Sequence, residues 1–99
     1  MKTMIGLLFV FRCDKAGVFA AKVEAIDEAN QKIKLTDSHR LWRWQAKDGI
    51  SLSEVATNGV SDGKICKPVT HWINSNDVYE AIEMNEAAFK TIKDHAKGI

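Results

Sequence analysis

The chain has 99 residues, enough for one compact domain and too few for two, and its 45% hydrophobic and 27% charged residues are typical of a folded globular protein. With 14 Lys and Arg against 13 Asp and Glu, the net charge of +1 excludes the large positive surplus typical of nonspecific duplex binders. We therefore expect one domain over residues 1–99, with nucleic acid a disfavoured partner.

The apolar run near the start predicts a buried strand over residues 4–13. Alternation gives this strand two apolar faces, one with Ile5, Leu7, Phe9 and Phe11 and the other with Leu8 and Val10. An apolar strand of this kind favours a homo-oligomer, because a small domain often buries excess apolar surface against a second copy. The run is far shorter than the roughly 20 residues of a membrane-spanning helix, so we expect a cytoplasmic protein without a membrane partner.

Two further strands follow, separated by turns. Residues 14–17 and 27–30 carry turn residues, and the segments 18–26 and 31–36 alternate between apolar and polar side chains. In the second segment this alternation buries Ile33 and Leu35. The first three strands therefore predict an antiparallel meander.

Residues 36–38 predict a break, after which residues 40–44 have the aromatic content of a fourth strand. Strict alternation places Arg40, Trp42 and Trp44 on one face, with Arg43 on the other. The two tryptophans then stand side by side, either as a wall of the core or as a surface that stacks on a planar ligand. Arg40 could cover an indole or meet a phosphate. Arg43 is solvated if its face is the exterior, which is favoured, and is paired or faces the ligand if its face is the interior.

A short helix and a polar loop come next. Ser51 fits an N-cap of a two-turn helix that stops at Asn58-Gly59. The loop from Gly59 to Lys67 is a second candidate binding element, because its backbone donors and the cations Lys64 and Lys67 suit an anion. The alternative is a solvated connection.

The last part predicts two strands and a helix. Strands are expected over residues 69–73 and 78–84, around a turn at 74–76. Asn85 can cap a helix with an i,i+4 pair between Glu86 and Lys90 and a stop at Gly98; its inward residues are Ala88, Phe89, Ile92 and Ala96. The predicted fold class is α+β and β-rich, a small antiparallel sheet or partly open barrel of about six strands with one short internal helix and a C-terminal helix.

The chain carries no recognisable catalytic or metal-binding motif. It lacks a phosphate-binding glycine motif, a nucleophile elbow and metal-ligand spacing, so we expect no enzyme, no cofactor and no metal. Cys13 and Cys66 are isolated and are interpreted as free thiols. The ligand-binding hypothesis includes seven residues: His39, Arg40, Trp42, Arg43, Trp44, Lys64 and Lys67.

An ordered series of motifs resembles a small family of uncharacterised phage and prophage proteins. These motifs are Arg40 to Trp44, Ser51 to Ala56, Gly59-Val60, Cys66-Lys67 and Ala81 to Met84, and the resemblance covers most of the chain from Ala16 onward. It implies a phage origin and a small β-rich fold, and it raises the possibility of a protein that counters host defence.

Three functions remain open at this point. The leading hypothesis is a phage accessory protein in the host cytoplasm that counters host defence by capturing a small nucleotide-like immune signal without chemistry. The second is an inhibitor that binds a host protein through exposed Trp and Arg side chains. The third is single-stranded nucleic-acid binding, which the near-neutral charge disfavours.

Overall fold

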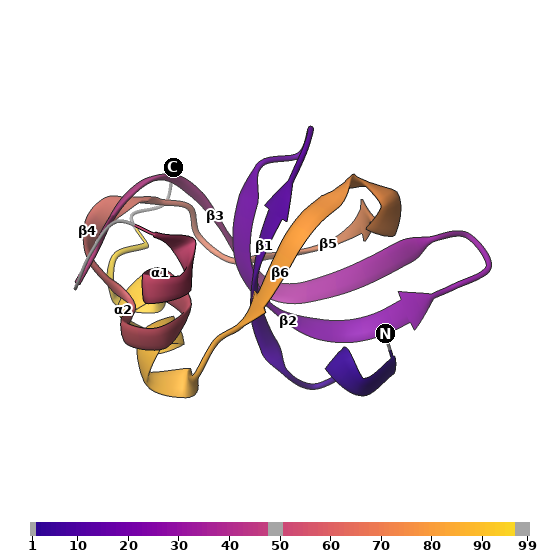
Figure 1. Ribbon diagram of the computed structural model, residues 1–99, viewed down its shortest axis with the longest axis horizontal. Helices are drawn as coiled ribbons and strands as arrows, with labels where there is room; N and C mark the ends of the chain where they lie inside the picture. Colours follow the sequence, from indigo (N-terminus) through magenta and orange to yellow (C-terminus); the bar gives the residue numbers. More distant parts are fainter. Residues whose placement is uncertain (1, 48–50, 97–99) are drawn as a thin grey trace.

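A curled half-barrel sheet with two helices at one end forms the structure, a computed structural model that describes residues 2–47 and 51–96 (Figure 1). The β-rich α+β fold with a short internal helix and a C-terminal helix is confirmed. In chain order the elements are η1 (Lys2–Met4), β1 (Leu8–Cys13), β2 (Val18–Asp27), β3 (Lys32–Ala46), α1 (Leu52–Asn58), β4 (Val60–Ile65), β5 (Val69–Asn74), η2 (Ser75–Asp77), β6 (Val78–Glu83) and α2 (Glu86–Asp94).

The strands β1, β2 and β3 form the expected antiparallel meander. The sheet runs in the order β4-β3-β2-β1-β6, and β5 pairs with β3 beside this path. The strand β1 begins at Leu8, not at residue 4, so Ile5 and Leu7 lie exposed before it. Both faces of β1 are buried within the chain itself, because Phe11 packs on one side of the sheet and Val10 on the other.

The strand β3 is one continuous element of 15 residues, so the predicted break at residues 36–38 is wrong. Asp37 adopts a positive φ of 52°, and the pairing of β3 with both neighbouring strands shifts register near it. A bulge of this kind lets a strand bend without leaving the sheet. The first part of β3 pairs with β5 and the second part with β4, and Cys66 to Pro68 connect these two strands.

Two clusters of buried side chains fill the two sides of the curled sheet. The barrel core contains Phe9, Phe11, Phe19, Val23, Ile33, Leu35 and Ile73. The helix core lies under α1 and α2 and contains Val10, Leu41, Val55, Val60, Ile65, Phe89 and Ile92. The sheet therefore has apolar residues on both faces where the two clusters meet, along β1, β2 and β3.

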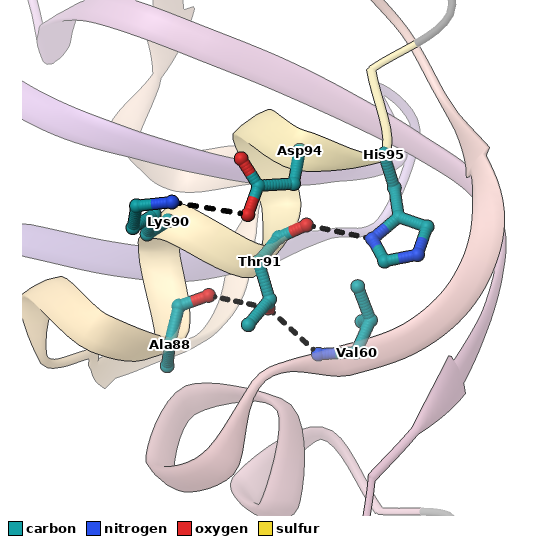
Figure 2. Close-up of polar contacts among 6 residues, drawn as sticks. All are labelled: Val60, Ala88, Lys90, Thr91, Asp94 and His95. Atoms are coloured by element: carbon teal, nitrogen blue, oxygen red, sulfur yellow. Dashed lines mark hydrogen bonds and ion pairs between the residues drawn. The ribbon is translucent and has the colours of Figure 1, made fainter.

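The segment expected to be a loop from Gly59 to Lys67 is mostly the strand β4, which is a correction to the sequence prediction. Its end residues Val60 and Ile65 are buried in the helix core. The helix α2 covers the outer edge of β4: the Thr91 hydroxyl accepts from the Val60 N–H at 2.9 Å and donates to the Ala88 carbonyl at 2.7 Å (Figure 2). Six strands are present as expected, although the strands predicted at residues 31–36 and 40–44 form the single strand β3, and β4 was not predicted.

The helix ends follow the capping signals in the sequence. The Ser51 hydroxyl accepts from the Glu54 N–H, and the Asn85 side chain accepts from the Ala88 N–H, as predicted. Lys90 forms its ion pair with Asp94 at 3.3 Å (Figure 2), rather than with the predicted partner one turn earlier. The predicted stop at residue 98 lies outside the described residues. No helix in the described part of the chain is long and apolar enough to cross a membrane.

Candidate functional site

A pocket opens beside β3 at the place where β4 ends and β5 begins. Its volume is about 340 Å³, and we call it the Arg40 pocket. Strand pairing assembles it from distant parts of the chain, because Arg40 lies opposite Phe19 on β2 and Ser38 opposite Val69 on β5. The lining residues are Phe19, Ser38, Arg40, Cys66, Lys67, Val69 and His71.

Arg40 is held in the pocket by an aromatic ring. Its guanidinium carbon lies 4.8 Å from the centroid of the Phe19 ring, a cation-π contact. Its carbonyl accepts from the Cys66 N–H at 2.9 Å, which fixes the backbone on either side of the pocket. A guanidinium with one face on a ring keeps its edge donors for an oxyanion. The expected contact between Arg40 and an indole is therefore wrong, and phenylalanine takes that place.

His71 is oriented by a buried hydroxyl. Its Nε2 lies 2.9 Å from the Ser38 Oγ, and its ring packs edge-on against Phe19 at a centroid distance of 4.9 Å. Burial, followed by the charge of Arg40, lowers the pKa of His71 below its ordinary value. The imidazole is therefore neutral near pH 7 and can present its other ring nitrogen to a ligand as a donor or an acceptor.

The pocket has a positive and partly apolar lining. Arg40 and Lys67 supply two cations, and among the described residues no acidic side chain lines the pocket. Phe19 and Val69 supply apolar surface. Cations next to an apolar wall suit a ligand that combines a planar or apolar part with a phosphate or carboxylate.

The Ser38 and His71 pair has the spacing of a nucleophile and its base, but its setting favours binding. Ser38 is 0% exposed, so its oxygen is inaccessible to an entering carbonyl or phosphoryl group. The described residues also contain no cluster of three or more His, Cys, Asp or Glu that could hold a metal ion. The pair is best interpreted as a device that holds the His71 ring in place.

The two tryptophans of β3 do not share a face, which is a correction. The pairing of β3 with β4 shifts register between Leu41 and Arg43, so alternation is interrupted at Trp42. Trp42 is 65% exposed on the outside, whereas Trp44 packs against the helix core. Trp44 instead lines a separate pocket of about 430 Å³ together with Arg12 and Leu52.

His39 is a core residue, so the expectation that it approaches a ligand is wrong. It is 1% exposed, and its Nδ1 lies 2.8 Å from the Cys66 carbonyl, which makes Nδ1 the donor. Its ring packs edge-on against Phe89 of α2. The Nε2 atom is buried and has no hydrogen-bond partner in the described part of the chain. Burial lowers the pKa of His39 more than any other cause.

The seven residues proposed from the sequence are therefore separated in space. Arg40 and Lys67 meet in the Arg40 pocket, while Arg43 and Lys64 face each other on the exposed surface of β3 and β4. The sequence did not point to Phe19, Ser38 or His71 as site residues. Only the pairing of β2, β3 and β5 brings them together, and no local pattern carries that information.

Comparison with known families finds a family model that covers most of the chain. A family model described as a domain of unknown function, DUF6948, matches residues 8–92. The chain belongs to the DUF6948 family. The DUF6948 match runs from the start of β1 into α2 and includes every residue that lines the Arg40 pocket. No match was found among curated proteins or among solved structures.

Proposed function

We propose that this protein binds a small, anionic, nucleotide-like ligand in the Arg40 pocket and performs no chemistry on it. The observation that carries the proposal is the convergence of Arg40 and Lys67 on a pocket walled by Phe19 and His71. Arginine and lysine are the side chains that bind phosphate, and the flat faces of Arg40 and His71 suit a planar ring.

The size of the pocket favours a ligand of which about one nucleotide enters each chain. Its volume of about 340 Å³ is at the lower end of the roughly 300–1,000 Å³ typical of small-molecule sites. We further propose, from the resemblance to phage proteins, that capture of such a ligand removes an immune signal in the cytoplasm of a host cell. The resemblance supports this biological role, and the pocket supports only the class of ligand.

Isothermal titration against cyclic nucleotides, nucleoside monophosphates and ADP-ribose tests the proposal. The chain offers matched controls, because Arg43 and Lys64 carry the same charges on an exposed surface away from the pocket. We expect Arg40→Gln and Lys67→Gln to weaken binding about tenfold or more, and Arg43→Gln and Lys64→Gln to bind like the wild type. The proposal is contradicted if no ligand of the panel binds, or if all four variants lose the same amount of affinity.

A second candidate function rests on the exposed surface of β3. Trp42 is 65% exposed and stands next to Arg43, and these are the residue types that anchor protein interfaces. An inhibitor of a host protein would use this surface and would leave the Arg40 pocket empty. Pull-down from host lysate with wild type and Trp42→Ala distinguishes the two functions, because only the inhibitor loses a polypeptide partner when the indole is removed. A labelled single strand that is retained instead indicates nucleic-acid binding.

A further inference from the structure

Three strands of the sheet have a partner on one side only among the described residues: β4, β5 and β6. An open edge strand can pair with another chain, and proteins usually protect such edges with charges, bulges or a covering element. The three edges differ in this protection, and the difference identifies one of them as a docking surface.

The edges of β4 and β6 are protected. On β4, the Val60 N–H donates to the Thr91 hydroxyl, and Ile65 forms a bridge with Ala96 after α2. On β6, a register shift interrupts the pairing with β1, and Glu80 and Glu83 add negative charge. Both features discourage pairing with another strand.

The edge of β5 differs in its charge: the strand carries no Asp, Glu, Lys or Arg, although its pairing with β3 also shifts register, between Leu35 and Ser38. Its sequence, Val-Thr-His-Trp-Ile-Asn, has no charged residue, proline or glycine and has high strand propensity. Val69 is 54% exposed and Trp72 is 50% exposed. Large apolar side chains on an uncharged edge are the features of a strand that pairs with another chain.

The hydrogen bonds of β5 to β3 show which backbone groups point outward. The Ser75 N–H donates to the Gln31 carbonyl at 2.9 Å, and Lys34 lies opposite Trp72. Because hydrogen-bonded and non-hydrogen-bonded pairs alternate in an antiparallel ladder, Trp72 belongs to a non-hydrogen-bonded pair. Its N–H and C=O therefore point away from β3, and so do those of Thr70 and Asn74, two residues to either side.

We propose that two copies of this chain pair through antiparallel β5 edges centred on Trp72. This register uses all three outward residues, since Thr70 of each copy meets Asn74 of the other and the two Trp72 residues face each other across the two-fold axis. No like charges oppose each other, because the strand is uncharged and the lowered pKa of His71 keeps that ring neutral. The two indoles lie on the same face and form an aromatic cross-strand pair.

The pairing has a consequence for the binding site. Val69 and His71 line the Arg40 pocket and belong to β5. In the dimer, the exposed side of Val69 comes next to the η2 turn of the second copy, so each pocket is closed by its neighbour. The pairing itself requires no ligand, and only this consequence rests on the proposed function.

Analytical ultracentrifugation with charge-swapped variants tests the dimer. In Trp72→Glu and in Trp72→Lys, two like charges meet at the two-fold axis, so we expect each variant to raise the dimer dissociation constant about tenfold or more. An equimolar mixture places opposite charges there and restores the dimer. The matched controls are Trp42→Glu and Trp42→Lys, which change an exposed tryptophan of β3 and leave dimerisation unchanged.

Trp72 also packs against the Lys34 ammonium, so its replacement removes a contact within the chain. Circular dichroism is therefore used to check that each variant is folded. A wild-type mass that stays monomeric up to about 200 μM overturns the proposal, because a dimer with a dissociation constant at or below that value would be substantially populated there. Equal weakening in the Trp42 variants, or a mixture that stays monomeric, also overturns it. Each readout is ligand-free, so failure of the dimer leaves the test of the Arg40 pocket intact.

Discussion

Gly59 joins α1 to β4 at a point where α2 leaves no room for a side chain. Its backbone has φ 85° and ψ −161°, a region that glycine alone adopts readily, and another residue there is strained by about 1–3 kcal/mol. A Cβ atom would overlap the Thr91 hydroxyl and would lie 3.1 Å from the Ala88 carbonyl. The overlap adds about 1–3 kcal/mol, as in other overpacked sites. We therefore expect Gly59→Ala to lower the free energy of unfolding by about 2–6 kcal/mol.

Urea denaturation measures this loss, and two further variants isolate its causes. Gly17 also has a positive φ, 106°, but a Cβ there meets nothing within 4 Å, so Gly17→Ala costs only the backbone strain of about 1–2 kcal/mol. Thr91→Ala removes the hydroxyl that satisfies the Val60 N–H, at a cost of about 1–3 kcal/mol.

In the double variant the new methyl group no longer meets the Thr91 side chain. The losses of Gly59→Ala and Thr91→Ala are then less than additive by about 1 kcal/mol or more. Additive losses, or a Gly59→Ala variant as stable as Gly17→Ala, refute the steric reasoning.

The histidines, the Cys13 thiol and the Asp77 carboxylate provide three further tests. Burial lowers the pKa of both His39 and His71, so the unfolded chain takes up protons at a higher pH than the folded chain. The free energy of unfolding is therefore full above about pH 6.5 and falls below it, with His39 contributing up to about 1.4 kcal/mol per pH unit. Melting temperatures that do not change from pH 7 to pH 5 contradict this. Burial and then the Asp77 carboxylate raise the pKa of the Cys13 thiol to about 11. Ellman's reagent at pH 8 should therefore label the partly exposed Cys66 and spare Cys13, and equal labelling rates of the two thiols contradict this expectation. The Asp77 carboxylate accepts hydrogen bonds from two backbone N–H groups of the turn between β1 and β2. Asp77→Ala should therefore lower the free energy of unfolding, measured by chemical denaturation, by about 1–3 kcal/mol, and a loss under about 0.5 kcal/mol shows that the turn does not depend on these bonds.

The periodicity of apolar residues and the helix-capping residues were enough to predict most of the fold. The meander, the caps at Ser51 and Asn85 and the positive φ of Gly59 follow from local rules, and the structure has them. The sequence failed where a bulge changes the alternation. One extra residue at Trp42 moved Trp44 to the core side, and the positive φ at Asp37 kept β3 continuous where a turn was predicted.

The candidate site was predictable only in part, for a related reason. Arg40 and Lys67 were selected by chemistry, and they do line one pocket. The rest of the pocket depends on which strands pair with β3 and in which register. Non-local pairing of this kind leaves no periodic signal along the chain, so His71 looked like an ordinary strand residue.

We propose that the ligand enters the Arg40 pocket, rather than contacting the exposed Trp42 or entering the pocket lined by Arg12 and Trp44. Amide chemical shifts of the labelled protein during titration with ADP-ribose and nucleoside monophosphates test it most directly. We expect saturable shifts concentrated at Ser38, Arg40, Lys67 and His71. Shifts centred on Trp42 or on Arg12 and Trp44, or no saturable shift with any of these ligands, would contradict it.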